Sequence, residues 1–231
     1  MTTTNRDVFV SPTASLQLGE YMSRVYSWMT AGILLTGVVA WYVATNEPLL
    51  SAMLGNKILF FGLIIAEFAL VIWLSARADR MSRVQASLMF LLYAALNGAT
   101  LSIISLIYTA ESIQSAFFTS ATAFAGLSAF GYVTKKDLGP IGSFCTMGLF
   151  GLIGFGLLSL FFPQLMGTTA SKVYGLVGII VFSGLTAYDT QKIKAGAYGQ
   201  GNGAILGALK LYLDFINLFL FILRMMGQRR R

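Results

Sequence analysis

The last apolar stretch of the chain, residues 203–226, constrains the fold more than any other feature. It is long enough to cross a membrane, yet two ionisable residues lie near its middle. Lys210 and Asp214 are four residues apart, so on a helix they share one face, which Asn217 extends. An ionised side chain at the centre of a bilayer costs roughly 2.5–3.5 kcal/mol on insertion scales. The sequence therefore predicts that protein or a water-lined cavity, and not lipid, surrounds this helix.

Six further apolar stretches are available to surround it. Together with the last, the predicted spans cover residues 28–45, 58–75, 84–108, 113–133, 141–162, 173–188 and 204–226. The chain is 56% hydrophobic and 11% charged, whereas a soluble domain carries about 25% charged residues. We therefore expect an all-α, polytopic membrane protein with seven transmembrane helices. Its predicted divisions are a flexible cytoplasmic tail (1–20), a transmembrane domain (21–227) and a basic C-terminal tail (228–231).

The distribution of lysine and arginine predicts the orientation of these helices. Alternate loops and the N-terminal segment hold nine of these residues, whereas the opposite side holds two before the C-terminus. Because basic loops stay in the cytoplasm, the N-terminus is predicted to be cytoplasmic. The arginines at 224 and 229–231 conflict with this rule if the seventh helix crosses. The alternative is a re-entrant helix, but we favour crossing because the apolar run is long enough.

Composition also excludes several classes of chemistry. The chain has no histidine, which removes imidazole metal sites, Ser-His catalysis and histidine pH switches. Its single cysteine, Cys145, excludes an intramolecular disulfide. The net charge of +7 comes from loops and the C-terminus, where topology and lipid headgroups explain it, so we expect no nucleic-acid partner. We expect no cofactor and no enzymatic activity.

Two further acids lie within or at the edge of the predicted spans. Asp189 ends the sixth span, where it is either a hydrated interfacial residue offset by Lys192 or a partner of Asp214. Glu67 lies near the middle of the second span, either as a protonated carboxyl bonded to a neighbouring helix or as a functional group.

A pair formed by Asp189 and Asp214 has a definite chemistry. Two carboxyl groups within hydrogen-bond reach do not both ionise readily, so they share a proton and titrate as a unit. Such a pair forms a pH-responsive latch between the last two helices, in which a cation can replace the proton. Carboxylate oxygens suit Ca²⁺ as metal ligands. Because a helix rises about 1.5 Å per residue, the acids meet only if the sixth helix tilts or the seventh begins below the membrane edge.

Three motifs resemble a known family. They are GLTAYDTQKIK (184–194), LYLDFINLFLFILRMMG (211–227) and TKKDL (134–138). With the Glu67-bearing second span, they closely resemble the Bax inhibitor-1 family of transmembrane Bax inhibitor motif proteins, in its bacterial inner-membrane branch. The resemblance implies that the last helix lies centrally between two three-helix groups. It also implies a pH-sensitive calcium leak gated by an aspartyl dyad, here Asp189 and Asp214, which Arg77 bonds in the closed state.

Three functions remain open at this point. The first is the calcium leak, with Asp189 and Asp214 as sensor, gate and cation ligands, although Lys210 would oppose cation entry. The second is an intramembrane aspartyl protease. Tyr188 and Asp189 match one of its elements, but the bulky residues 211–213 replace the Gly-x-Gly expected before the second acid. The third is a non-conducting protein that modulates a membrane protease or another partner through its tails. The expected partners are therefore the lipid bilayer, Ca²⁺ or protons, and a membrane protein.

Overall fold

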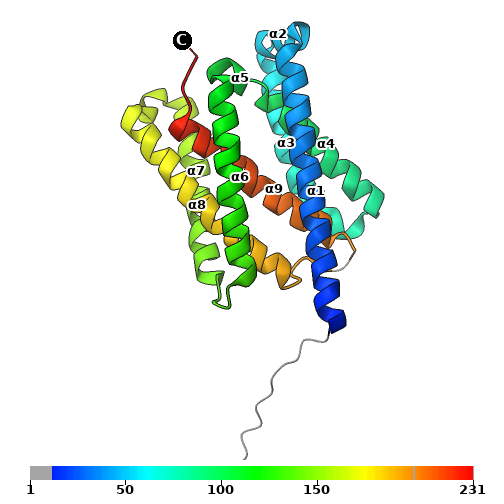
Figure 1. Cartoon of the computed structure of the whole chain (residues 1–231). Helices are drawn as coiled ribbons and strands as arrows, with labels where there is room; N and C mark the ends of the chain where they lie inside the picture. The colour runs from blue at the N-terminus through cyan, green and yellow to red at the C-terminus, as the bar shows by residue number, and fades with distance from the viewer. Residues whose placement is uncertain (1–11, 200, 231) are drawn as a thin grey trace, which may run out of the picture.

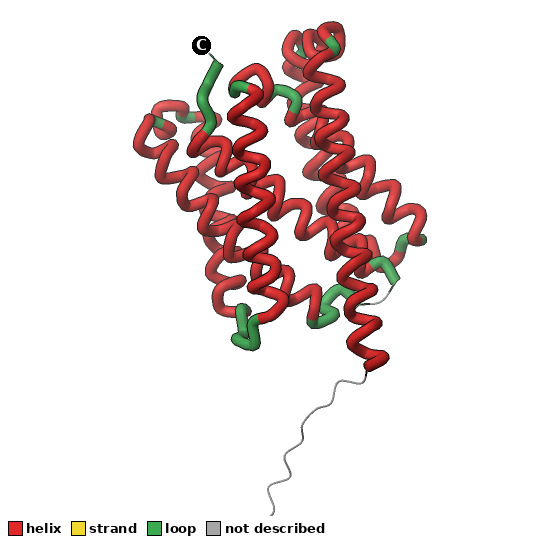
Figure 2. The backbone as a smooth tube through the Cα atoms, in the orientation of Figure 1, coloured by secondary structure: helices red, strands yellow, loops and turns green. Residues whose placement is uncertain are grey.

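A computed structural model describes residues 12–199 and 201–230, and helices make up most of this part of the chain (Figure 2). Its helices are α1 (Pro12–Thr45), α2 (Glu47–Gly55), α3 (Lys57–Arg77), the 3₁₀ turn η1 (Ala78–Arg80), α4 (Arg83–Leu101), α5 (Ile104–Ile107), α6 (Ala110–Val133), α7 (Gly139–Phe161), the 3₁₀ turn η2 (Pro163–Met166), α8 (Thr168–Lys194) and α9 (Gly203–Met226). Seven of these segments are long and apolar enough to cross a membrane. The predicted all-α, seven-span fold is confirmed.

Helix α9 lies at the centre of the bundle. Helices α1, α3 and α4 pack together on one side of it, and α6, α7 and α8 pack together on the other (Figure 1). Fifteen of the 24 residues of α9 are buried, compared with three of the 23 residues of the peripheral helix α7. The surrounding helices thus bury Tyr212 and Asp214 of α9, whereas Lys210, which was expected to share this cover, has an exposed side chain.

Several helix boundaries differ from those expected. Helix α1 begins at Pro12, within the segment predicted as a tail, and residues 1–11 lie outside the described part of the chain. The third span breaks after Leu101, where the Ser102 hydroxyl donates to the carbonyl oxygen of Ala99 at 2.6 Å. The short helix α2 lies between the first two spans. Its N-terminus is capped by Asn46, whose side chain accepts a hydrogen bond from the Leu49 amide at 3.2 Å.

The C-terminal helix crosses the whole bundle. Figure 1 shows α9 running from the end where α1 begins to the opposite end, where the chain terminates. Arg224, which conflicted with the charge rule, donates to the Ser171 hydroxyl at 2.9 Å and lies 5.0 Å from the centre of the Tyr174 ring. Beyond α9, the amide of Arg230 donates to the carbonyl of Ile107 at 2.9 Å. The part of the basic tail that the structure describes is therefore held against α5. Helix α9 is a single unbroken helix from one end of the bundle to the other and makes no re-entrant turn.

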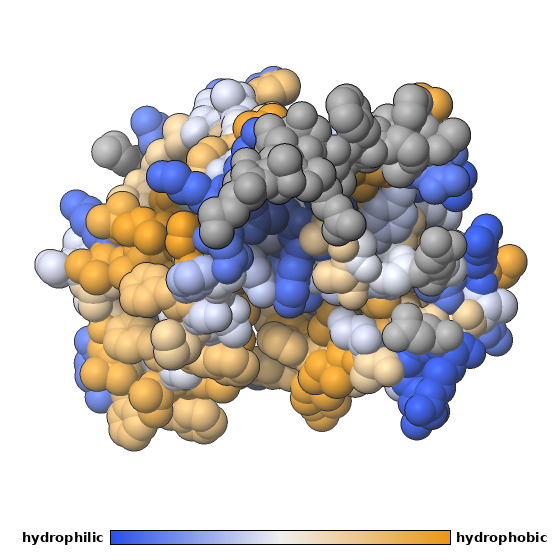
Figure 3. All heavy atoms as spheres, turned by 90° about the horizontal axis from the view of Figure 1, so that it is seen from below, coloured by the Kyte–Doolittle hydropathy of each residue, from blue (hydrophilic) through white to orange (hydrophobic). Residues whose placement is uncertain are grey.

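The opposite end of the bundle carries the loops rich in lysine and arginine. Viewed from that end, hydrophilic residues gather over the surface and apolar residues lie toward its sides (Figure 3). This arrangement is typical of a bundle whose polar ends lie at the two membrane–water interfaces.

Glycine allows two of the helices to approach closely. A β-carbon added at Gly131 of α6 would collide with the backbone carbonyl of Ala187 in α8. A β-carbon added at Gly126, also on α6, would meet nothing within 4 Å. Contacts between small residues and a facing backbone are a main source of helix association in membranes. The α6–α8 contact therefore depends on the absence of a side chain at Gly131.

We expect Gly131→Ala to lower the apparent melting temperature of the purified protein in detergent. Overpacking at a tight contact costs about 1–3 kcal/mol, and each kcal/mol shifts the midpoint of a chain of this size by roughly 2–4 °C. Gly126→Ala is the matched control, because both changes gain the same helix propensity. Equal melting temperatures for the two variants would show that the contact at Gly131 does not limit stability.

Candidate functional site

Helices α8 and α9 bring Asp189 and Asp214 together. The two carboxyl groups lie within hydrogen-bond reach of each other. Both side chains are buried, with exposed fractions of 5% for Asp189 and 4% for Asp214. The structure thus places the two acids as the predicted pair. Asp189 is not the hydrated interfacial residue of the alternative interpretation, and no ion pair joins it to Lys192 within the described residues.

The oblique path of α9 resolves the difference in depth between the two acids. Asp189 lies five residues before the end of α8, whereas Asp214 lies eleven residues beyond the start of α9. In Figure 1, α9 runs diagonally across the bundle beside α8. A tilted helix descends less than 1.5 Å through the membrane for each residue, so Asp214 remains near the level of Asp189.

The pair leaves one buried carboxyl oxygen without a hydrogen-bond partner in the described part of the chain. Oxygen Oδ2 of Asp214 is buried and has no hydrogen-bond partner among the described residues. An ionised carboxylate only accepts hydrogen bonds, so two ionised acids leave this oxygen unpaired and place two negative charges side by side. With one proton, one carboxyl donates to the other, and the buried oxygens are satisfied. The arrangement can hold a single proton or a cation between α8 and α9.

Two lysines lie close enough for their charges to act on the pair. The positive charges of Lys210 and Lys192 both act on Asp189. Lys210 itself is exposed and makes no hydrogen bond or ion pair within the described residues, although it shares a helix face with Asp214. The Lys192 ammonium lies 5.1 Å from the centre of the Tyr188 ring. Neither lysine therefore occupies the space between the two acids.

Tyr198 approaches the pair from the loop between α8 and α9. Burial, and next the negative charges of Asp189 and Asp214, raise the pKa of the Tyr198 hydroxyl above its usual range. The hydroxyl therefore keeps its proton at physiological pH and remains a potential hydrogen-bond donor. This residue was not singled out in the sequence, where only the surrounding glycines mark the loop.

The glycine-rich loop sets the start of α9. Gly196, Gly199 and Gly201 have φ angles of 76°, 68° and 86°, which other residues rarely adopt. At the end of the loop, Asn202 is 6% exposed, and its amide nitrogen donates to the carbonyl oxygens of Ala78 at 2.7 Å and Met81 at 2.8 Å. Asn202 therefore ties the start of α9 to the turn between α3 and α4.

Arg77, the predicted latch, is the last residue of α3. Its side chain is exposed, and no hydrogen bond or ion pair within the described residues joins it to Asp189 or Asp214. The connection from this end of α3 to α9 runs instead through Asn202, beginning one residue after Arg77. The role of Arg77 in closing the site stays a prediction.

A second buried polar cluster surrounds Glu67 on α3, whose side chain is 8% exposed. Thr100 and Asn97, both on α4, donate to the two carboxyl oxygens of Glu67, with a distance of 3.4 Å from Asn97. The Tyr212 hydroxyl of α9 donates to Asn97 at 3.1 Å and shares a 2.7 Å hydrogen bond with the Thr36 hydroxyl of α1. Glu67 is thus bonded to a neighbouring helix, as one interpretation expected.

The two polar clusters lie on different faces of α9. Tyr212 and Asp214 are two residues apart, so their side chains leave the helix about 200° apart. Asn217, the remaining polar residue of α9, donates only to the carbonyl of Leu213 in its own helix, at 2.8 Å. Within residues 12–199 and 201–230, no group of three or more His, Cys, Asp or Glu residues is placed to hold a metal ion.

Comparison with known proteins identifies the family to which this architecture belongs. The family model described as "Inhibitor of apoptosis-promoting Bax1" matches residues 18–231. The chain belongs to the Bax inhibitor-1 family. Among relatives, the Escherichia coli inner membrane protein YbhL is 45% identical over 97% of each chain. An uncharacterized protein of Rickettsia prowazekii is 42% identical over 92% of this chain and 91% of its own length. The predicted resemblance is confirmed.

In this Bax inhibitor-1 protein, we expect Asn202→Ala to weaken the contact between the start of α9 and the turn that connects α3 to α4. The change removes two hydrogen bonds and leaves the half-buried Met81 carbonyl oxygen without a donor, whereas the Ala78 carbonyl still accepts from the Met81 amide at 3.2 Å. An unsatisfied group costs about 1–3 kcal/mol. Hydrogen exchange followed by mass spectrometry should show faster exchange in residues 78–82 and 201–206.

Asn217→Ala provides the matched control for Asn202→Ala, because the Asn217 amide bonds only within its own helix turn. It should leave exchange in both segments unchanged. Identical exchange in wild type and Asn202→Ala would show that this residue does not join the helices.

Proposed function

We propose that this protein is a cation leak, with Ca²⁺ as its principal ion, whose opening is set by the proton shared between Asp189 and Asp214. The observation that carries the proposal is the buried contact between the two carboxyl groups, together with an Asp214 oxygen that has no hydrogen-bond partner in the described part of the chain. A pair of this kind ties α8 to α9 when one proton is bound. It repels, or takes up a cation, when the proton leaves.

The sign of the pH dependence follows from this contact. At low pH the shared proton bonds the two acids and holds α8 against α9. As pH rises and the proton is lost, two adjacent negative charges separate the helices and attract a divalent cation. The charges of Lys210 and Lys192 act on the pair, and the pair acts on the hydroxyl of Tyr198. Cation flux is therefore expected to rise between about pH 6 and pH 8.

The second polar cluster extends the path proposed for the cation. Glu67 lies on another face of α9 with Asn97 and Thr100, all buried or half-buried within the apolar bundle. Intramembrane ionisable groups commonly mark ion or proton pathways because they are otherwise expensive. Glu67 is accordingly assigned as an auxiliary oxygen site, whereas Lys210, whose side chain is exposed, limits cation entry from its own face.

Two observations support a place in the bacterial inner membrane. A relative that matches nearly the full length of the chain is named as an inner membrane protein of Escherichia coli, and seven helices are suited to crossing a bilayer. The N-terminus is proposed to be cytoplasmic because the loops at its end of the bundle carry most of the basic residues.

The alternative functions have less support. A protease needs space for a substrate strand beside the acid, but Leu211 and Tyr212, just before Asp214, are fully buried at 0% exposure. If the protein acts by binding a partner, the C-terminal tail was one of the segments expected to make that contact. Gln228 and Arg230 are bonded to residues around α5 and the start of α6, so the described part of this tail is engaged within the chain. The protein is therefore proposed not to be an enzyme.

We expect calcium flux through proteoliposomes to rise several-fold between pH 6 and pH 8 for the wild type and to lose this pH dependence in Asp189→Asn and Asp214→Asn. An asparagine amide neither binds nor releases a proton in this range, so each variant keeps one fixed state. The measurement is uptake of Ca²⁺ by vesicles loaded with a fluorescent indicator, repeated at several pH values.

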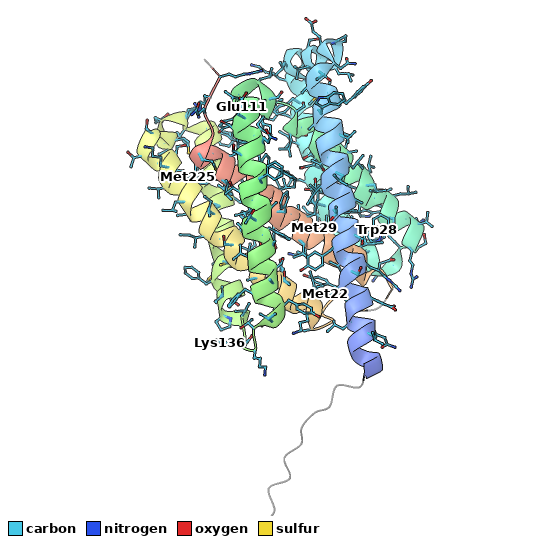
Figure 4. The ribbon with its side chains drawn as sticks, viewed as in Figure 1. Met22, Trp28, Met29, Glu111, Lys136 and Met225 are labelled. Carbon is cyan, nitrogen blue, oxygen red and sulfur yellow. The ribbon has the colours of Figure 1, made fainter. Side chains whose placement is uncertain are left out.

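Glu111→Gln is the control for this flux experiment, because Glu111 is an exposed acid at the far end of α6 (Figure 4). It should retain the wild-type pH profile. Arg77→Gln tests the latch separately: a changed pH profile would assign Arg77 to the closed state. Absence of calcium flux at every pH, or an unchanged pH profile in both aspartate variants, would overturn the proposed function.

A further inference from the structure

Helices α1 and α6 leave a groove between them. Each of the two packs along α9, but they make few contacts with each other. Figure 1 shows them running side by side in front of α9, and two cavities of about 590 Å³ and about 500 Å³ lie in this space. Phe215 of α9 lines both cavities, so they adjoin along one floor.

One continuous face of each helix lines this groove. On α1 the lining residues recur every three or four positions and include Met22, Tyr26, Met29, Ile33, Gly37 and Ala40. On α6 they include Phe117, Ala121, Phe124, Ala125, Ser128 and Tyr132. This spacing keeps each set on one side of its helix, and in Figure 4 Met22 and Met29 lie on the side of α1 that faces α6. The groove therefore extends along most of the length of both helices.

The floor of the groove is apolar and closed. The ring of Phe215 packs edge-on against Phe117 and Phe124, each with 5.7 Å between ring centres. Phe215 follows Asp214 directly in the chain, but its ring faces the groove, whereas the Asp214 carboxyl is buried against α8. The groove is thus a space of its own, separated from the acid pair by the body of α9.

The walls favour a flexible, apolar occupant. A β-carbon added at Gly37 would meet nothing within 4 Å. On the opposite wall, the small side chains of Ala121 and Ala125 on α6 leave space for an occupant. Methionine side chains such as Met22 and Met29 adapt to irregular apolar partners. The groove opens sideways between two spanning helices, toward the hydrocarbon of the bilayer, and an empty apolar space of this size would forfeit dispersion contacts along its whole lining. An acyl chain matches both its shape and its chemistry.

The end of the groove near the start of α1 carries positive charge. The Lys194 ammonium donates to the carbonyl of Tyr132, a lining residue, at 2.6 Å and lies 4.8 Å from the centre of its ring. Lys135 and Lys136 follow α6 after one residue, Thr134, and Figure 4 shows Lys136 extending beyond the foot of α6. Of the acids nearby, Asp137 accepts a hydrogen bond from the Gly139 amide at 2.8 Å, and Glu20 is paired with Arg24 at 3.5 Å on a face of α1 that does not line the groove. This charge complements an anionic headgroup.

We propose that the groove between α1 and α6 binds one anionic phospholipid, with an acyl chain against Phe215 and the phosphate beside Lys194. The lipid would come from the leaflet that meets the basic end of the bundle. Because α1 belongs to one three-helix group and α6 to the other, the bound lipid joins the two groups on the side that no helix covers.

Native mass spectrometry of the full-length protein tests the proposal. The protein is purified in detergent and incubated with palmitoyl-oleoyl phosphatidylglycerol or, separately, with palmitoyl-oleoyl phosphatidylcholine. We expect one phosphatidylglycerol molecule to stay bound to each chain at an activation energy that removes phosphatidylcholine. Lys194→Gln should weaken retention of phosphatidylglycerol roughly fivefold, as expected for loss of one cation near the headgroup.

A matched pair of variants locates the lipid. Ala125→Phe places a ring in the groove and should remove most of the bound phosphatidylglycerol. Gly126→Phe places the same ring one position along α6, outside the groove lining and in open space, and should leave binding unchanged. Gly37→Phe repeats the test from α1 if Ala125→Phe does not yield a monodisperse protein.

Three outcomes would overturn the proposal. Equal retention of both lipids would show that the headgroup is not recognised. Equal retention by Ala125→Phe and Gly126→Phe, or by Gly37→Phe if that variant replaces Ala125→Phe, would place the lipid elsewhere. A second copy of the chain in place of bound lipid would make the groove a dimer interface. None of these readouts depends on calcium flux, so the proposed leak can fail while lipid binding stands.

Discussion

Burial of α9 is the constraint on which the rest of the structure depends. Its middle carries Asp214, which is buried at a depth where a charge facing hydrocarbon is expensive. Helices α1, α4, α6 and α8 all contact α9, and their fit relies on small residues. At Gly207, for example, an added β-carbon would lie 3.3 Å from Val25 and 3.4 Å from Ile193. The two three-helix groups pack on opposite sides of this one polar helix and together enclose most of it.

The central position of α9 also couples two polar clusters that share no hydrogen bond. Tyr212 joins α9 to α1 and α4 through Thr36 and Asn97, whereas Asp214 faces Asp189 on α8. The two residues are separated by a single position on one rigid helix. A small rotation of α9 about its own axis would therefore disturb both clusters together, which gives a physical route by which a proton at one face affects Glu67 at the other.

The sequence predicted the seven spans because membrane burial leaves a strong local signal, and it predicted the central helix because charges within an apolar run require cover. The pairing of Asp189 with Asp214 could also be predicted, because the two acids lie on consecutive helices within recognisable motifs. Other features depend on distant contacts. Asn202, for example, bonds to carbonyls 124 and 121 positions away. A single sequence carries no local trace of such pairings.

The order in which the chain is made gives the position of α9 a particular meaning. The helix that fills the centre is made after the other six described spans, and residues 228–230 then bond to residues around α5. Until α9 has been made, the six earlier helices surround an unfilled space, and Asp189 has no carboxyl partner. The polar interior is therefore assembled only once α9 is inserted, and a chain truncated before α9 would expose that interior to lipid and to quality-control proteases.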